Sequence, residues 1–199
     1  MIRAPLDGES QLLLASLPRL VAGVGAAQLV TVVGVAGSAP RAIGARMLCV
    51  DGRLIAGTIG GGRLEEEALG WAAASAEKPG FSGQSRRFQL GPELAQCCGG
   101  VVDLWVESID GATAILRANA LAHAQATSGE LHSRAGDIEW TEVVDALQTV
   151  VIFGAGHVGT ALAGALAVLP WRIIAVDDRP QWADPGRFAP RVEVERINP

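Results

Sequence analysis

Apolar residues near the N-terminus follow a helical pattern. Between Leu12 and Val24 they recur at spacings of three and four, which predicts an amphipathic helix over residues 9–26. Pro18 lies inside this pattern and cannot donate a backbone hydrogen bond, so we expect a break or a kink near Leu17. The helix is interpreted as a packing element.

Short apolar runs follow, separated by glycine-rich or polar turns. An Asp51-Gly52 pair between two such runs is a strong signal for a two-residue hairpin turn. The predicted elements are a buried strand over 29–35, a hairpin over 46–58, a helix from the glycines at 60–62 to about 76, strands over 85–90 and 101–107, and a helix over 111–126.

The C-terminal part of the chain carries a nucleotide-binding pattern. A buried strand over 149–153 leads into Gly154, Gly156 and Gly159 in a G-x-G-x-x-G arrangement, followed by a helix over 157–169. A second strand over 172–176 ends at Asp177, about 20 residues after the glycines, where a Rossmann fold places its ribose-binding acid. Only 22 residues (199 − 177) follow Asp177, and many are turn-like.

These patterns predict an α/β protein with two parts. The first is a mixed α/β domain over 1–127, the polar stretch 128–147 is a linker, and 148–199 form an incomplete Rossmann-like βαβ domain. A doubly wound sheet needs more strands than this segment offers, so we expect either a truncated domain or a sheet that a partner chain completes, and we favour truncation.

Composition narrows the class of protein. A hydrophobic content of 49% is enough to build a core, and a net charge of −5 argues against non-specific nucleic-acid binding. There is neither a run of about 18 apolar residues nor a basic, apolar leader at the N-terminus, so we expect a cytoplasmic protein without a membrane span. Three cysteines are too few for a disulfide scaffold and fit reduced thiols.

Two of the three cysteines are adjacent, in the segment Gln96-Cys97-Cys98-Gly99-Gly100. A thiol that meets a ligand needs an open loop of this kind, whereas a packed cysteine does not. Cys49 is instead interpreted as a small core residue that shares one face of its strand with Met47. Adjacent cysteines lack the C-x₂₋₄-C spacing of zinc sites, so the pair is interpreted as a soft contact point, and either sulfur can be the one that binds.

Two further loops have the chemistry of anion sites. Ser38 and Arg41 lie in a glycine-framed loop, where an arginine suits a phosphate or a carboxylate but can equally face solvent. Gly60, Gly61 and Gly62 precede an acid-rich helix start that includes Glu65. Their backbone N–H groups can bind an anion, or the glycines can simply make a tight connection. We expect the glycine turn and the cysteine loop to share one rim, because each lies at a strand end.

With these motifs in order, the chain resembles the XdhC/CoxI family of accessory proteins of xanthine dehydrogenase and related molybdenum hydroxylases. The resemblance rests on residues 33–48, 57–65, 90–100 and 151–180. Ser38-Ala39-Pro40-Arg41 differs from the commoner Ser-Thr-Pro-Arg form by one hydroxyl. The resemblance implies a protein without a reaction of its own. It implies that the protein binds the molybdenum cofactor (molybdopterin or its dinucleotide), protects it during sulfuration by a cysteine desulfurase, and inserts it into an apo-hydroxylase.

Residue patterns and resemblance together give a candidate site and leave alternatives open. Cys97 and Cys98 are the candidate molybdenum or sulfur contacts, and the equivalent roles of Asp177 and His157 toward a nucleotide stay open. The cofactor-binding candidates are Ser38, Arg41, Gly60, Gly61, Gly62, Glu65, Gln96, Cys97, Cys98, Gly99, Gly100, Gly154, Gly156, His157, Gly159 and Asp177. The alternative function is an NAD(P)-linked oxidoreductase, although the chain has no tyrosine for a Tyr/Lys catalytic pair. A third possibility is a docking segment that forms a homo-oligomer through an exposed strand edge.

Overall fold

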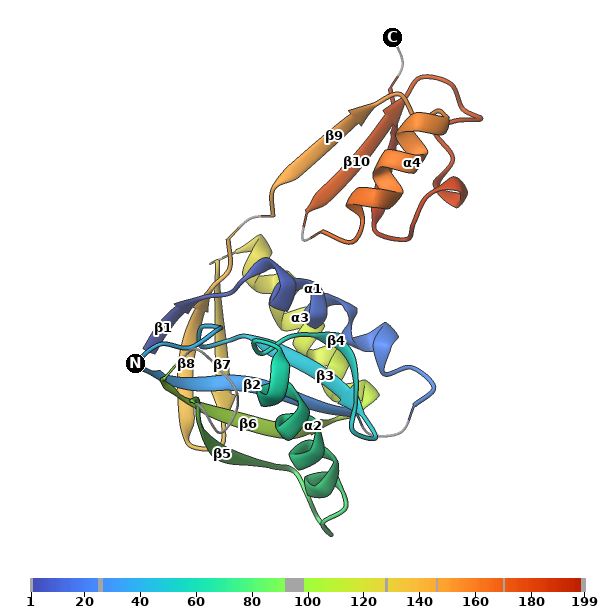
Figure 1. Ribbon diagram of the computed structural model, residues 1–199. Helices are drawn as coiled ribbons and strands as arrows, with labels where there is room; N and C mark the ends of the chain where they lie inside the picture. The colour runs from blue at the N-terminus through green and yellow to red at the C-terminus, as the bar shows by residue number, and fades with distance from the viewer. Residues whose placement is uncertain are drawn as a thin grey trace. The chain divides into compact units, whose positions relative to one another are not determined.

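The computed structural model describes residues 2–24, 27–91, 99–127, 129–145, 147–169 and 171–197. The chain divides into two compact units, Met1–Asp145 and Ala146–Pro199, whose elements are labelled in Figure 1. Within the described ranges, no helix has the length and apolar character needed to cross a membrane.

A five-stranded antiparallel sheet forms the centre of the first unit (Figure 1), with the strand order β4-β3-β2-β6-β5. The strands are β2 (Ala27–Ala36), β3 (Arg46–Val50), β4 (Arg53–Gly57), β5 (Gly83–Gln89) and β6 (Val101–Ile109). The predicted hairpin is confirmed as β3 and β4, and both turn residues, Asp51 and Gly52, have positive φ angles of 50° and 72°. This is the backbone geometry that the Asp-Gly signal predicts.

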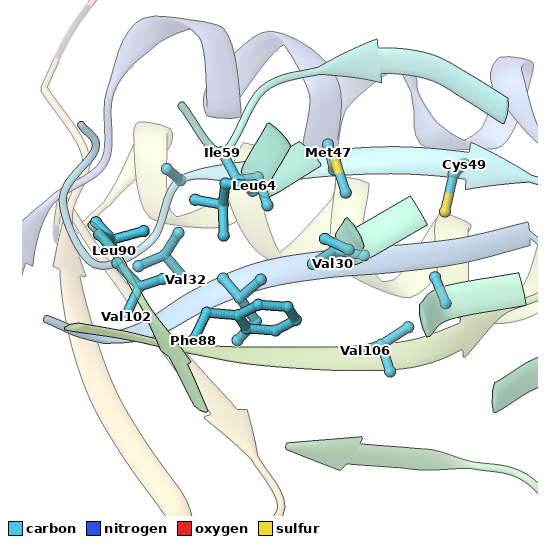
Figure 2. Packing of buried hydrophobic residues seen from close by; sticks show 14 residues of the cluster. Val30, Val32, Met47, Cys49, Ile59, Leu64, Phe88, Leu90, Val102 and Val106 are labelled. Atoms are coloured by element: carbon cyan, nitrogen blue, oxygen red, sulfur yellow. The ribbon is translucent and has the colours of Figure 1, made fainter. Parts of the chain in front are cut away.

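Helix α2 (Gly62–Ala76) covers one face of this sheet. Alternate residues of the strands point toward it, and Figure 2 shows Val30, Met47, Leu64 and Phe88 in the shared core. Cys49 belongs to the same cluster and is fully buried, so its predicted packing role with Met47 is confirmed.

Helices α1 (Gly8–Leu20) and α3 (Gly111–Ala126) pack on the opposite face with the other set of strand residues. Each begins with an aspartate cap, in which Asp7 accepts from the Ser10 N–H and Asp110 from the Thr113 N–H, both at 2.8 Å. α1 contains Pro18 and ends at Leu20, earlier than the predicted residue 26. A proline near a helix end removes only one backbone bond, which explains why the helix tolerates it there.

The prediction of a linker over 128–147 is wrong. Strands β7 (Glu130–Ala135) and β8 (Ile138–Val143) form a hairpin there, and β1 (Ile2–Pro5) pairs in parallel with β8. The stretch looked polar because several of its polar side chains, including Ser133 and Glu142, are buried in a hydrogen-bonded network instead of facing solvent. Trp140 packs on Val33 beneath the hairpin, so the first unit extends to Asp145.

The second unit is a Rossmann-like βαβ arrangement with one strand more than predicted. It contains β9 (Thr149–Phe153), α4 (His157–Leu166), β10 (Arg172–Asp177), a short 3-10 helix (Pro185–Arg187) and β11 (Val192–Arg196). All three strands are parallel, in the order β11-β10-β9, which is the 3-2-1 order of a Rossmann half. The mixed α/β unit followed by a Rossmann-like segment confirms the predicted fold class.

Candidate functional site

The loop that follows β2 lies against two of the other predicted site segments. The Gly100 N–H donates to the Ser38 carbonyl at 3.1 Å, and the Leu90 N–H donates to the Gly100 carbonyl at 2.8 Å. A Cβ atom on Gly100 would lie 2.7 Å from the Ala36 carbonyl oxygen, and one on Gly60 would lie 2.7 Å from the Pro40 Cβ atom. Glycine is therefore required at both positions for the backbones to approach this closely.

These contacts bring together most of the predicted residues of the first unit. The 36–45 loop touches the glycine turn on one side and the end of the cysteine-containing segment on the other. We name this arrangement the three-loop cluster; its candidate residues are Ser38, Arg41, Gly60, Gly61, Gly62, Glu65, Gly99 and Gly100. Gln96, Cys97 and Cys98 lie outside the described residues, although Gly99 and Gly100 follow them directly in the sequence.

Glu65 is the internal partner of the glycine turn. Its Oε1 atom accepts from the backbone N–H groups of Ile59 and Gly61, both at 2.9 Å, and also from the Thr58 hydroxyl. Gly60, Gly61 and Gly62 all have positive φ angles, so the turn has a backbone that other residues rarely adopt. The carboxylate thus occupies N–H groups that the sequence offered to an external anion.

Arg41 is oriented by two acids at the start of α1. Its Nη2 atom lies 3.2 Å from Asp7 Oδ2 and 3.2 Å from Glu9 Oε2, and its side chain is partly buried. Ser38 is exposed in the same loop. A phosphate that binds Arg41 would therefore have to share the guanidinium with Asp7 and Glu9 or displace them.

In the second unit, the three fingerprint glycines have the geometry that a dinucleotide turn requires. Gly154 has a φ angle of 100° and donates to the Val176 carbonyl at 2.8 Å. A Cβ atom on Gly159 would lie 3.0 Å from the Gly154 carbonyl carbon, so the third glycine permits close packing of helix on turn. Gly156 caps α4, and the exposed His157 ring meets Trp182 edge-on with centroids 5.2 Å apart.

Asp177 is buried and its carboxylate is held within the unit. It accepts from the Ala155 N–H at 2.7 Å and from the Arg179 guanidinium at 2.8 Å through both oxygens. The hydrogen bonds from Arg179 are the main reason why the pKa of Asp177 lies well below its ordinary value. Asp177 therefore fixes the glycine turn, and its lone pairs are largely used.

A cavity of about 290 Å³ lies beside this turn. The residues that line it are Phe153, Gly154, Val176, Asp177, Asp178, Arg179 and Ile197. Asp178 is exposed, and it was considered from the sequence only as part of a turn. Its position next to Asp177 makes it the more accessible acid for a ribose hydroxyl, a role that the Asp-Asp pair in the sequence already offered.

Comparisons with known proteins follow this geometry. Residues 21–87 match the model of the XdhC and CoxI family. This span includes Ser38, Arg41, the glycine turn and Glu65, so the family resemblance is confirmed and the first unit carries an XdhC and CoxI domain. No curated protein matches the chain.

A solved structure with a similar fold is the crystal structure of a xanthine dehydrogenase from Bacillus halodurans. The two structures align with a TM-score of 0.65 at 19% sequence identity, over 94% of this chain and 68% of the other. At this identity the likeness concerns the fold.

Proposed function

We propose that this protein binds the molybdenum cofactor, holds it while a cysteine desulfurase partner supports its sulfuration, and passes it to an apo-hydroxylase of the xanthine dehydrogenase type. The observation that carries the proposal is the three-loop cluster: segments about 20 to 60 residues apart, which together carry the family pattern, meet at one place. Binding and transfer require a cradle of this kind and no reaction of the protein itself.

The residues of the cluster fit an anionic cofactor in specific ways. A Cβ atom on Gly61 or Gly99 would meet nothing within 4 Å, so a ligand can approach the backbone at both positions. Arg41 supplies a planar guanidinium for a phosphate or a pterin oxygen. Cys97 and Cys98 would supply the soft donors suited to molybdenum or sulfur. When bound, the cofactor supplies the metal centre, and the chain positions and shields it.

Cofactor retention tests this proposal. Purified protein is mixed with released molybdenum cofactor, passed through gel filtration and assayed for molybdenum by elemental analysis. We expect metal to elute with the wild type and to be lost from the Cys97→Ala/Cys98→Ala double variant. Cys49→Ala is the matched control, because that thiol is buried in the core and should leave retention unchanged. Metal-free wild type, or equal retention by the double variant, would overturn the thiol assignment.

The arginine loop has its own control. Arg41→Gln should weaken retention, whereas Arg53→Gln, an exposed arginine on β4, should not. Asp7→Asn releases one of the acids that pair with Arg41 and should strengthen binding of an anionic cofactor. If Asp7→Asn and Arg41→Gln weaken retention equally, Arg41 acts as part of the α1 cap and not as a ligand.

The second candidate function is an NAD(P)-linked oxidoreductase, favoured by the intact glycine turn and the cavity beside it. Titration of NADH fluorescence tests for the cofactor. Micromolar binding that Gly159→Val abolishes would support it, because a side chain there meets the Gly154 carbonyl. Unchanged NADH fluorescence would exclude this second function and leave the first untouched.

Self-association is part of the proposal as well. β9 lies at the edge of the three-stranded sheet, and the side chain of Phe153 is 79% exposed. An edge strand with exposed apolar residues can pair with another copy. Light scattering should then show a homo-oligomer that Phe153→Lys dissociates, and a strict monomer would contradict this part.

A further inference from the structure

A cavity of about 250 Å³ lies in the first unit, on the face of the sheet covered by α1 and α3. It is separate in composition from the three-loop cluster and shares no residue with it. The lining residues come from α1, β3, α3 and β7, and they are Leu14, Arg46, Thr113, Leu116, Arg117, Ala120, Leu131, His132 and Ser133.

The cavity is lined by two arginines that each retain an unused donor. The Arg46 side chain is 1% exposed, and its Nε–H has no acceptor among the described residues. The Nε–H of Arg117 is likewise buried without one. A buried donor without an acceptor is unfavourable, so both groups favour a ligand or water that brings an oxygen atom.

The acids that balance these arginines are not among the lining residues. Arg46 pairs with the fully buried Glu142 at 2.7 Å, and Arg117 donates to both oxygens of Glu107 at 2.7 Å. Burial raises the pKa of Glu107 above its ordinary value, which weakens its negative charge relative to Arg117. The charged side chains that line the cavity are therefore basic, and they favour an anionic oxygen over a cation.

The remaining wall is apolar and the volume is small. Leu14 and Leu131 are buried, and Leu116 and Ala120 come from α3. Pockets for drug-sized ligands occupy roughly 300–1,000 Å³, so this cavity suits a smaller molecule. We propose that it binds a small monocarboxylate, whose carboxylate accepts from the Nε–H groups of Arg46 and Arg117 and whose short alkyl body packs on the leucines.

Ligand-observed NMR and calorimetry with sodium hexanoate test this site. Hexanoate should bind the wild-type protein, while 1-hexanol and hexylamine, which have the same chain but no carboxylate, should bind about tenfold more weakly or not at all. Acetate should also bind more weakly, because it lacks the alkyl body. No binding of hexanoate at millimolar concentration, or equal binding of hexanol, would overturn the proposal.

Two alanines on α3 give a matched pair of variants. Ala120→Phe fills the cavity and should abolish hexanoate binding, whereas Ala122→Phe, on the same helix but outside the lining, should leave it unchanged. Arg117→Gln removes one donor without filling the space and should weaken binding about tenfold. Equal loss in both alanine variants, or none in Arg117→Gln, would contradict the site. The Cys97→Ala/Cys98→Ala variant should still bind hexanoate, so this inference and the proposed cofactor function can fail separately.

Discussion

The buried ion pair between Arg46 and Glu142 connects the small sheet to the central one and gives a sharp prediction. Arg46 comes from β3 and Glu142 from β8, and the two side chains are 1% and 0% exposed. The Arg46 Nη1 atom also donates to the Gly44 carbonyl at 2.7 Å, at the end of the loop that contains Arg41. The pair therefore positions both the β7–β8 hairpin and one side of the three-loop cluster.

Glu142→Gln keeps the size of the side chain and removes its charge. The guanidinium is then buried without a counter-ion, and breaking a buried pair in this way costs about 3–5 kcal/mol. Typical domains are stable by only about 5–15 kcal/mol, so a large part of the stability of the first unit should be lost. Glu139→Gln on the same strand is the control, because Glu139 and Arg134 are exposed and 3.8 Å apart. Its effect should stay below about 1 kcal/mol.

Urea unfolding followed by tryptophan fluorescence measures the difference. The assay uses a background with Trp171→Phe and Trp182→Phe, so that the remaining tryptophans report on the first unit alone. A loss below about 1 kcal/mol for Glu142→Gln would refute the reasoning. The double variant Arg46→Met/Glu142→Leu should recover most of the stability, because it removes both charges together.

Three further predictions concern single positions. In a variant whose other two cysteines are alanine, Cys49 should stay unreactive toward Ellman's reagent until the protein unfolds, because burial raises the pKa of its thiol to about 11; rapid reaction in the folded protein would contradict its packing. Gly60→Ala should lower the melting temperature, because it places a Cβ atom at a φ angle of 128° against the neighbouring proline, whereas Gly70→Ala on the open face of α2 should not. Asp177 should titrate well below its usual pKa of about 3.9 in NMR spectra, and Arg179→Gln should move the pKa back up. Its contribution to stability is then present above the unfolded pKa and is lost as pH falls through the native value; a wild-type pKa near 4 would exclude this pairing.

Local patterns were sufficient for most elements of the fold. The Asp51-Gly52 turn and the helix from Gly111 to Ala126 carry their own signals, since turn conformation and helical periodicity depend on neighbours in sequence. Strand β1 has no such signal. It is four residues long, includes Pro5, and depends on pairing with β8, whose residues follow more than a hundred positions later.

The β7–β8 hairpin failed for a different reason. Sequence patterns assume that polar residues face solvent, but Ser133, Thr141 and Glu142 are buried here. Ser133 and Arg46 both donate to Glu142, so the burial of each depends on a partner from another element. A hydrophobic period cannot reveal such a network, because the partners that permit burial are far away in the sequence.

The candidate site shows the same division between local and distant information. The sequence identifies the glycines, because a positive φ angle or a close backbone approach is a local requirement. It does not identify the partners of the charges. Glu65 turns back onto its own glycine turn, and Arg41 binds Asp7 and Glu9 from α1.

These partners change how the three-loop cluster can hold an anion. The backbone N–H groups of Ile59 and Gly61 already bind Glu65, so they contribute little attraction to a second negative group. Arg41 can change partners, because its two contacts are 3.2 Å long and both acids are partly exposed. Attraction for a phosphate should therefore depend more on Arg41 than on the glycines, whose main contribution is a backbone that a ligand can approach closely. The cysteine doublet would then add a soft donor to a cradle whose charge is set from α1, which is why the acids of that helix are the most informative positions to change.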